Sequence, residues 1–159
     1  SSRYCIEDYL KLPNIKIIGL IRGGNDVISS VMGRSKKNFR VACHRWQRAI
    51  EVIHGLKTAY PELVLVVSFE SLVSHPRENA ERIAEFLEVQ YQERMLEGPQ
   101  YNPWYPEAGM NREKVNRAQR ESIDFNLSER LPATYRRYEE LLDWCKIEPK
   151  RSGETQRHG

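Results

Sequence analysis

Two residues in the first quarter of the chain, Arg22 and Ser30, are of the types that bind a phosphate group. An arginine guanidinium is a planar fork that can donate paired hydrogen bonds to phosphate oxygens, and a serine hydroxyl adds a neutral donor. Gly23 and Gly24 follow the arginine and allow the backbone to turn tightly, and Asp26 or Asn25 can cap a helix. If a helix begins after this turn, Ser30 lies about one turn into it. The spacing therefore predicts a site that holds one phosphate between Arg22 and Ser30.

The same residues also have purely structural interpretations. Arg22 could pair with Asp26 or Glu70 at the edge of a sheet, where exposed ion pairs contribute little stability. Ser30 taken alone would more often be a helix cap or a solvent-facing hydroxyl than a ligand-binding group. The phosphate hypothesis therefore depends on the two residues together.

The elements that must position this turn can be predicted from hydrophobic periodicity. Residues 15–21 and 63–69 are short, nearly continuous apolar runs, typical of strands that are covered on both faces. Between them, apolar residues recur at three- and four-residue spacing from Phe39 to Leu56, which predicts an amphipathic helix. A strand, a helix and a strand in this order become parallel members of one sheet. Arg22 then lies at the carboxyl end of the first strand, where open parallel sheets gather ligands.

The rest of the chain predicts two more helices, a loop and a polar tail. One helix begins at Pro76, and the last runs from about residue 131 to 145. Residues 98–109 contain three prolines among aromatic residues, which predicts a loop, and residues 148–159 are typical of a frayed tail. We therefore expect a single, partial domain over residues 1–147. Because two strands cannot bury both faces of a sheet, we interpret residues 4–12 as the end of a helix that follows an upstream strand.

The order of these motifs resembles that of the sulfotransferase family. In this family an arginine ends a buried strand, an acid follows in the turn, and a serine comes eight residues after the arginine, as Arg22, Asp26 and Ser30 do here. Gly23 and Gly24 depart from the family, which more often has an acid or asparagine followed by proline. The resemblance implies a three-layer α/β/α fold with a parallel sheet, the P-loop-NTPase-like sulfotransferase fold, here truncated at the N-terminus. It also implies that Arg22 and Ser30 hold the 3′-phosphate of the co-substrate 3′-phosphoadenosine 5′-phosphosulfate (PAPS).

Other segments extend the resemblance. Arg45-Trp46 and residues 67–76 follow the family's order, so that the resemblance covers residues 10–90. The segment 111–117 is similar to a late basic segment that closes over the 3′-phosphate, which implies binding roles for Arg112 and Lys114. The implied function is transfer of a sulfuryl group from PAPS to an unidentified acceptor hydroxyl or amine.

Two parts of the family's site have no counterpart in this sequence. One is the glycine- and serine-rich loop that binds the 5′-phosphosulfate. The other is a general base upstream of Arg22, where Glu7 and Asp8 are the only candidates and neither lies in a recognisable motif. No catalytic residue is therefore assigned, and a non-catalytic nucleotide-binding remnant of the same fold is the alternative hypothesis.

Composition limits the other classes of function. The chain has 25 Lys and Arg against 22 Asp and Glu, and a formal net charge of +3 does not favour a dedicated nucleic-acid-binding protein. Residues 34–57 hold seven basic residues and one acid, so that a basic nucleic-acid-binding module is the third and weakest hypothesis. The three cysteines fit neither a disulfide framework nor a metal site, and no apolar run approaches the roughly 20 residues that cross a bilayer. We expect a cytoplasmic protein without a metal or a membrane span.

Overall fold

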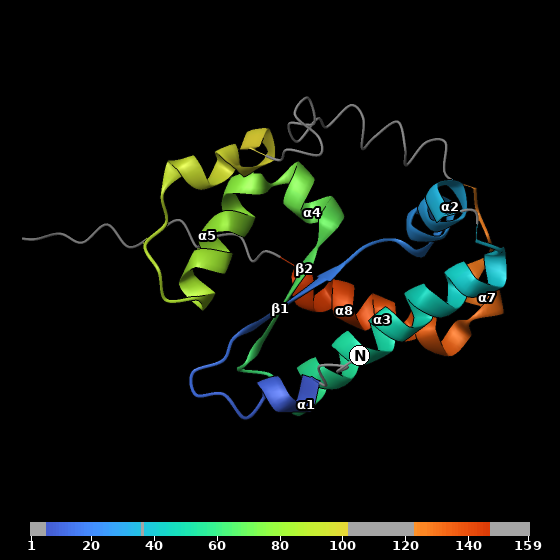
Figure 1. Ribbon diagram of the computed structural model, residues 1–159, viewed down its shortest axis with the longest axis horizontal. Coiled ribbons are helices and arrows are strands. Elements are labelled where there is room, and N and C mark those ends of the chain that lie inside the picture. The colour runs from blue at the N-terminus through green and yellow to red at the C-terminus, as the bar shows by residue number, and fades with distance from the viewer. Residues whose placement is uncertain (1–5, 36, 102–122, 147–159) are drawn as a thin grey trace, which may run out of the picture.

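The computed structural model describes residues 6–35, 37–101 and 123–146 of the 159-residue chain (Figure 1). The elements in chain order are α1 (Ile6–Tyr9), β1 (Ile17–Ile21), α2 (Gly24–Ser35), α3 (Phe39–Ala59), β2 (Val64–Ser68), α4 (Phe69–Ser74), α5 (Pro76–Phe86), the 3-10 helix η1 (Glu93–Tyr101), α7 (Leu127–Arg130) and α8 (Pro132–Cys145).

The two strands form the predicted parallel pair. Ile17 of β1 lies opposite Val64 of β2, and Ile21 lies opposite Ser68, so that the carboxyl ends of both strands meet at one edge. The long helix α3 joins the strands, as the apolar spacing predicted. Arg22 and Phe69 therefore leave the sheet side by side.

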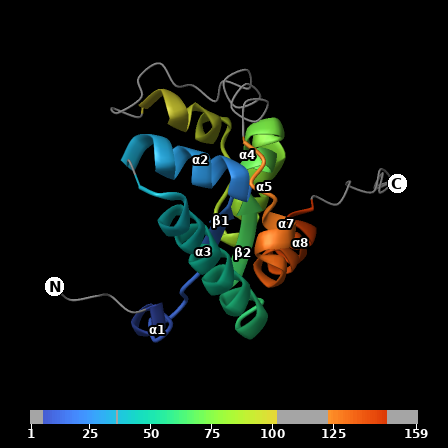
Figure 2. The ribbon, with the colours of Figure 1, turned by 90° about the vertical axis from the view of Figure 1, so that its right-hand side faces the viewer.

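Helices lie on both faces of this sheet, which makes three layers. α3 and α8 pack against one face, and α5 lies against β2 on the other (Figures 1 and 2). The close approach of α3 has a sequence requirement, because a β-carbon at Gly19 would lie 2.8 Å from a methyl carbon of Ile53. All five residues of β2 are buried, as expected for a strand covered on both faces.

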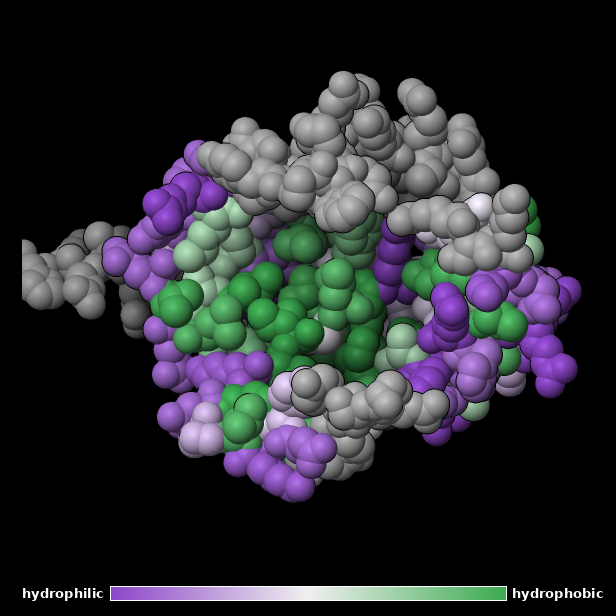
Figure 3. All heavy atoms as spheres, viewed as in Figure 1, coloured by the Kyte–Doolittle hydropathy of each residue, from purple (hydrophilic) through white to green (hydrophobic). Residues whose placement is uncertain are grey.

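Strand β1 is covered less completely than β2. Its side chains alternate, with Ile21 buried while Ile18 and Leu20 are 41% and 53% exposed. The space-filling view shows apolar side chains gathered across the middle of one face of the molecule (Figure 3). In the described part of the chain the sheet has two strands, and one face of β1 is left partly exposed. This agrees with the expectation that two strands cannot bury both faces of a sheet.

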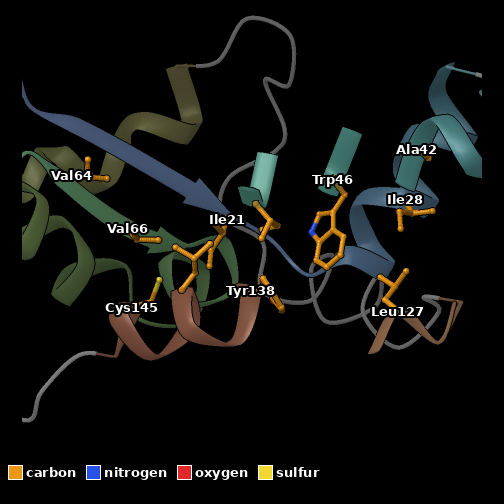
Figure 4. Packing of buried hydrophobic residues seen from close by; sticks show 11 residues of the cluster. Ile21, Ile28, Ala42, Trp46, Val64, Val66, Leu127, Tyr138 and Cys145 are labelled. Atoms are coloured by element: carbon orange, nitrogen blue, oxygen red, sulfur yellow. The ribbon is translucent and has the colours of Figure 1, made fainter. Parts of the chain in front are cut away.

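The core lies between the sheet, α2, α3 and α8 (Figure 4). Trp46 of α3 is 2% exposed and packs edge-on against Tyr138 of α8, with ring centroids 5.6 Å apart. Ile28 of α2 and Leu141 of α8 have no exposed surface. The packing of these helices fixes the position of the turn after β1.

Several boundaries differ from the sequence prediction, and the two strands begin at Ile17 and Val64 rather than at residues 15 and 63. The second strand ends at Ser68 rather than residue 69, because the Ser68 hydroxyl accepts a hydrogen bond from the backbone N–H of Ser71 and caps α4, a short helix that periodicity did not predict. The loop prediction for residues 98–109 is wrong at its start, where η1 extends to Tyr101. Glycine and proline indicate a loop in the sequence, and a 3-10 helix lacks the 3.6-residue apolar period by which helices are predicted. The remainder of that loop and the tail 148–159 lie outside the described residues.

Candidate functional site

Arg22 directly follows β1 and is held on two sides. Its Nη2 atom lies 3.3 Å from Oδ2 of Asp26, and the guanidinium carbon lies 4.6 Å from the centre of the Phe69 ring. The Asp26 side chain is 9% exposed and that of Arg22 is 27% exposed. Of the two ion pairs that the sequence allowed, the structure therefore contains Arg22–Asp26.

The ion pair uses only part of the guanidinium. Arginine has five N–H donors, and the Nε atom of Arg22 is buried with no hydrogen-bond partner among the described residues. A buried donor without an acceptor costs free energy, so Arg22 has donor capacity that the folded chain does not use. An anion with more than one oxygen would suit this group.

Helix α2 begins at Gly24, earlier than the sequence predicted. The Val27 N–H donates to the Gly23 carbonyl (3.1 Å), so that Asp26 lies in the first turn of the helix rather than capping it. Ser30 is consequently in the second turn, not the first. The cause is that the two glycines let the chain enter the helix immediately after the strand.

Ser30 shares a helix face with Asp26, because residues four apart lie one above the other on a helix. Asp26 contacts Arg22, which places the serine on the side of α2 that continues from the arginine. No hydrogen bond joins Ser30 to Arg22 in the described part of the chain. Arg112 and Lys114 lie outside the described residues.

Glu70 and Trp46 contact this turn directly. The Trp46 Nε1–H donates to the Arg22 carbonyl (3.1 Å), and the Gly23 N–H donates to Oε1 of Glu70 (2.9 Å). The place of Glu70 after the second strand was a usable signal, because the two strand ends meet at one edge. Trp46 gave no such signal, since its spacing is that of any core residue of the helix.

Tyr138 lies beside the same turn. Its hydroxyl is 3.7 Å from the point that a β-carbon on Gly23 would occupy. Burial, assisted by the charge of Glu70, raises the pKa of Tyr138 well above its usual value, so this hydroxyl stays protonated. Burial also raises the pKa of the Cys145 thiol to about 11, which makes it a poor nucleophile at neutral pH.

A second concave surface, which we call the basic groove, lies at the start of α3. Its volume is about 940 Å³, and Arg40, Arg45 and Arg130 are among the residues that line it. None of the described residues lining it is acidic. Part of the basic charge noted over residues 34–57 therefore faces one groove that favours an anionic ligand.

The described residues contain neither a metal-binding cluster nor a membrane-spanning helix. No group of three histidine, cysteine or carboxylate side chains among them could hold a metal ion. No helix among them is both long and apolar enough to cross a membrane.

The family to which these features belong follows from comparison with known proteins. A model of the sulfotransferase family matches residues 9–93, more than half of the chain, including both strands and Arg22. The chain belongs to the sulfotransferase family. The resemblance inferred from Arg22, Asp26 and Ser30 is thereby confirmed.

Two relatives of this sulfotransferase-family chain are named protein-tyrosine sulfotransferases. Protein-tyrosine sulfotransferase A of Caenorhabditis elegans is 30% identical over 98 residues, which are 55% of this chain and 26% of the relative. The protein-tyrosine sulfotransferase of Drosophila melanogaster is 28% identical over 92 residues, which are 53% of this chain and 18% of the relative. The chain thus spans about a quarter or less of the length of these relatives.

A solved structure confirms the fold class. The sulfotransferase domain from the Synechococcus PCC 7002 olefin synthase superposes with a TM-score of 0.65 at 21% identity, over 84% of this chain and 50% of that domain. The predicted α/β sulfotransferase fold with a parallel sheet is therefore correct, and the chain corresponds to half of that solved domain.

Gly24 provides a stability test of the turn. A β-carbon there would lie 2.4 Å from Cδ1 of Leu127 and 2.9 Å from the Trp46 ring, so we expect Gly24→Ala to lower the free energy of unfolding by about 1–3 kcal/mol. The matched control is Gly33→Ala in the same helix, because nothing lies within 4 Å of its β-carbon position. We expect this control to raise stability by up to about 1 kcal/mol through helix propensity. Urea denaturation measures both, and equal effects would contradict the packing account.

Proposed function

We propose that this chain uses PAPS as sulfuryl donor and transfers the sulfuryl group to an acceptor hydroxyl or amine. The observation that carries the proposal is the position of Arg22, at the carboxyl end of β1 and directly before α2, with a buried guanidinium nitrogen that no described residue satisfies. Family membership supports the reaction class.

In this proposal Arg22 and Ser30 bind the 3′-phosphate of the nucleotide. The guanidinium donates to the phosphate oxygens, and the serine hydroxyl approaches from α2, whose N-terminus favours negative charge. Arg112 and Lys114 would close over the same phosphate. Binding energy from this remote group would orient the donor, which is the form of catalysis that sulfuryl transfer, like phosphoryl transfer, requires most.

The acceptor that should be tested first is a tyrosine phenol. Both curated relatives carry the name protein-tyrosine sulfotransferase, although this chain covers only a small part of each. A phenolic hydroxyl falls within the proposed acceptor class. A sugar hydroxyl and an amine serve as comparison acceptors.

A second candidate is a nucleotide-binding domain that lacks transferase activity by itself. The observation that favours it is the absence from the sequence of a recognisable 5′-phosphosulfate loop. Such a domain would keep the 3′-phosphate site and bind the nucleotide without turnover.

Nucleotide binding and sulfuryl transfer test the two candidates together. We expect adenosine 3′,5′-bisphosphate to raise the melting temperature more than 5′-AMP does, because a ligand that binds only the folded state stabilises it according to its affinity. Transfer of labelled sulfate from PAPS to a tyrosine peptide would support the enzyme. Binding without transfer would support the binding domain, and equal thermal shifts with both nucleotides would contradict both candidates.

A further inference from the structure

The peptide group that joins Arg22 to Gly23 is held at both of its ends by side chains. Its carbonyl accepts a hydrogen bond from Trp46 Nε1 (3.1 Å), and its N–H donates to Glu70 Oε1 (2.9 Å). A peptide group is a rigid plane, so two hydrogen bonds on opposite edges fix its rotation. We propose that Trp46 and Glu70 are positioning residues that orient Arg22 toward the anion. This inference rests on the proposed function.

The turn needs such a restraint because of its composition. Rotation of the peptide plane changes ψ of Arg22 and φ of Gly23, and glycine by itself allows a wide range of φ. The next residue is also glycine, and it cannot be replaced by a residue with a side chain without moving Trp46 or Leu127. Two consecutive glycines would leave the direction of the arginine poorly defined. The two hydrogen bonds fix the backbone direction that the glycines leave free.

The two positioning residues are themselves fixed by different parts of the fold. Trp46 belongs to α3, is 2% exposed and packs edge-on against Tyr138. Glu70 belongs to α4, whose start is set by the Ser68 cap at the end of β2. The orientation of Arg22 is therefore tied to the helix that links the strands and to the strand next to its own.

The Glu70 side chain also lowers the stability of the folded chain in a way that an apolar side chain at this position would not. Its Oε2 atom is buried and has no hydrogen-bond partner among the described residues. A buried carboxylate oxygen without a donor is destabilising, and such groups in native proteins often mark functional sites. A side chain that only filled space at this position would avoid the penalty.

The test compares affinities for adenosine 3′,5′-bisphosphate and 5′-AMP, measured by calorimetry. Trp46→Phe removes the N–H donor and keeps an aromatic ring, and Glu70→Leu removes the acceptor. We expect each to weaken binding of the bisphosphate about 3–10-fold, with little effect on 5′-AMP, as the loss of one hydrogen bond predicts. Glu70→Gln keeps an amide oxygen that can accept from Gly23, and it should restore most of the affinity.

Matched controls use the same substitutions elsewhere. Trp144→Phe changes a tryptophan that stacks on His54, and Glu85→Leu changes an exposed glutamate of α5. Neither should alter the ratio of the two affinities. If Trp46→Phe and Glu70→Leu lower stability and weaken both nucleotides equally, their role is only structural and the inference is wrong.

A readout that needs no nucleotide separates failure of this inference from failure of the proposed function. We call the hydrogen bonds of Trp46 and Glu70 to the Arg22–Gly23 peptide group the clamp. If the clamp forms, the Gly23 amide proton exchanges slowly with solvent, and exchange accelerates in both Glu70→Leu and Trp46→Phe, as measured by NMR. Fast exchange in the unmodified chain would overturn the clamp. Slow exchange in a chain that binds both nucleotides equally would instead overturn the proposed function, and with it the role of the clamp in anion binding.

Discussion

Replacing Arg22 with glutamine is expected to weaken binding of adenosine 3′,5′-bisphosphate about 10–100-fold, the cost of losing charge-assisted hydrogen bonds to a phosphate. Binding of 5′-AMP should change little, because that nucleotide lacks the 3′-phosphate. Glutamine retains polarity but loses both the charge and the fork of donors. Calorimetry gives the affinity of the chain for each nucleotide, and the effect is read as the change in the ratio of the two affinities.

Arg136→Gln is the matched control for this experiment. Arg136 is an exposed residue of α8, and its loss removes the same charge from the molecule. We expect an unchanged affinity ratio in this variant. If Arg22→Gln also leaves the ratio unchanged, the Arg22–Asp26 pair is a structural contact and the phosphate hypothesis fails.

Leu141→Ala is expected to cause the largest loss of stability, about 2–5 kcal/mol. The Leu141 side chain has no exposed surface and belongs to the cluster that joins α8 to the sheet and α3. Truncation removes apolar surface from the core and leaves a cavity, and both effects favour the unfolded chain. Urea denaturation followed by circular dichroism measures the difference.

Leu87→Ala is the corresponding control, since Leu87 is 38% exposed at the end of α5. Its truncation should cost less than about 1.5 kcal/mol, because only part of the side chain is buried. Similar losses in the two variants would show that α8 is not docked on the sheet in solution as it is in the structure. The nucleotide affinities of the Leu141→Ala variant can be measured at a temperature where it remains folded.

The sequence alone determined the central βαβ unit and the place of Arg22 within it. Apolar runs of strand length and a three- and four-residue spacing are local signals that depend on few distant contacts. They were sufficient to place the arginine at the carboxyl end of a parallel strand. The start of α2 was predicted two or three residues too late, because no periodic signal marks where a chain leaves a Gly-Gly turn.

Only the tertiary structure decided how the turn is held. Trp46 is 24 residues from Arg22, and Glu70 is 47 residues from Gly23. Both contacts are hydrogen bonds between a side chain and the backbone, and their formation depends on the angle at which α3 and α4 pack on the sheet. The same packing makes Gly24 obligatory, since Leu127 approaches it from a segment more than 100 positions away. A sequence pattern records which residues face the core, whereas the distances between their atoms arise only when separate elements pack together.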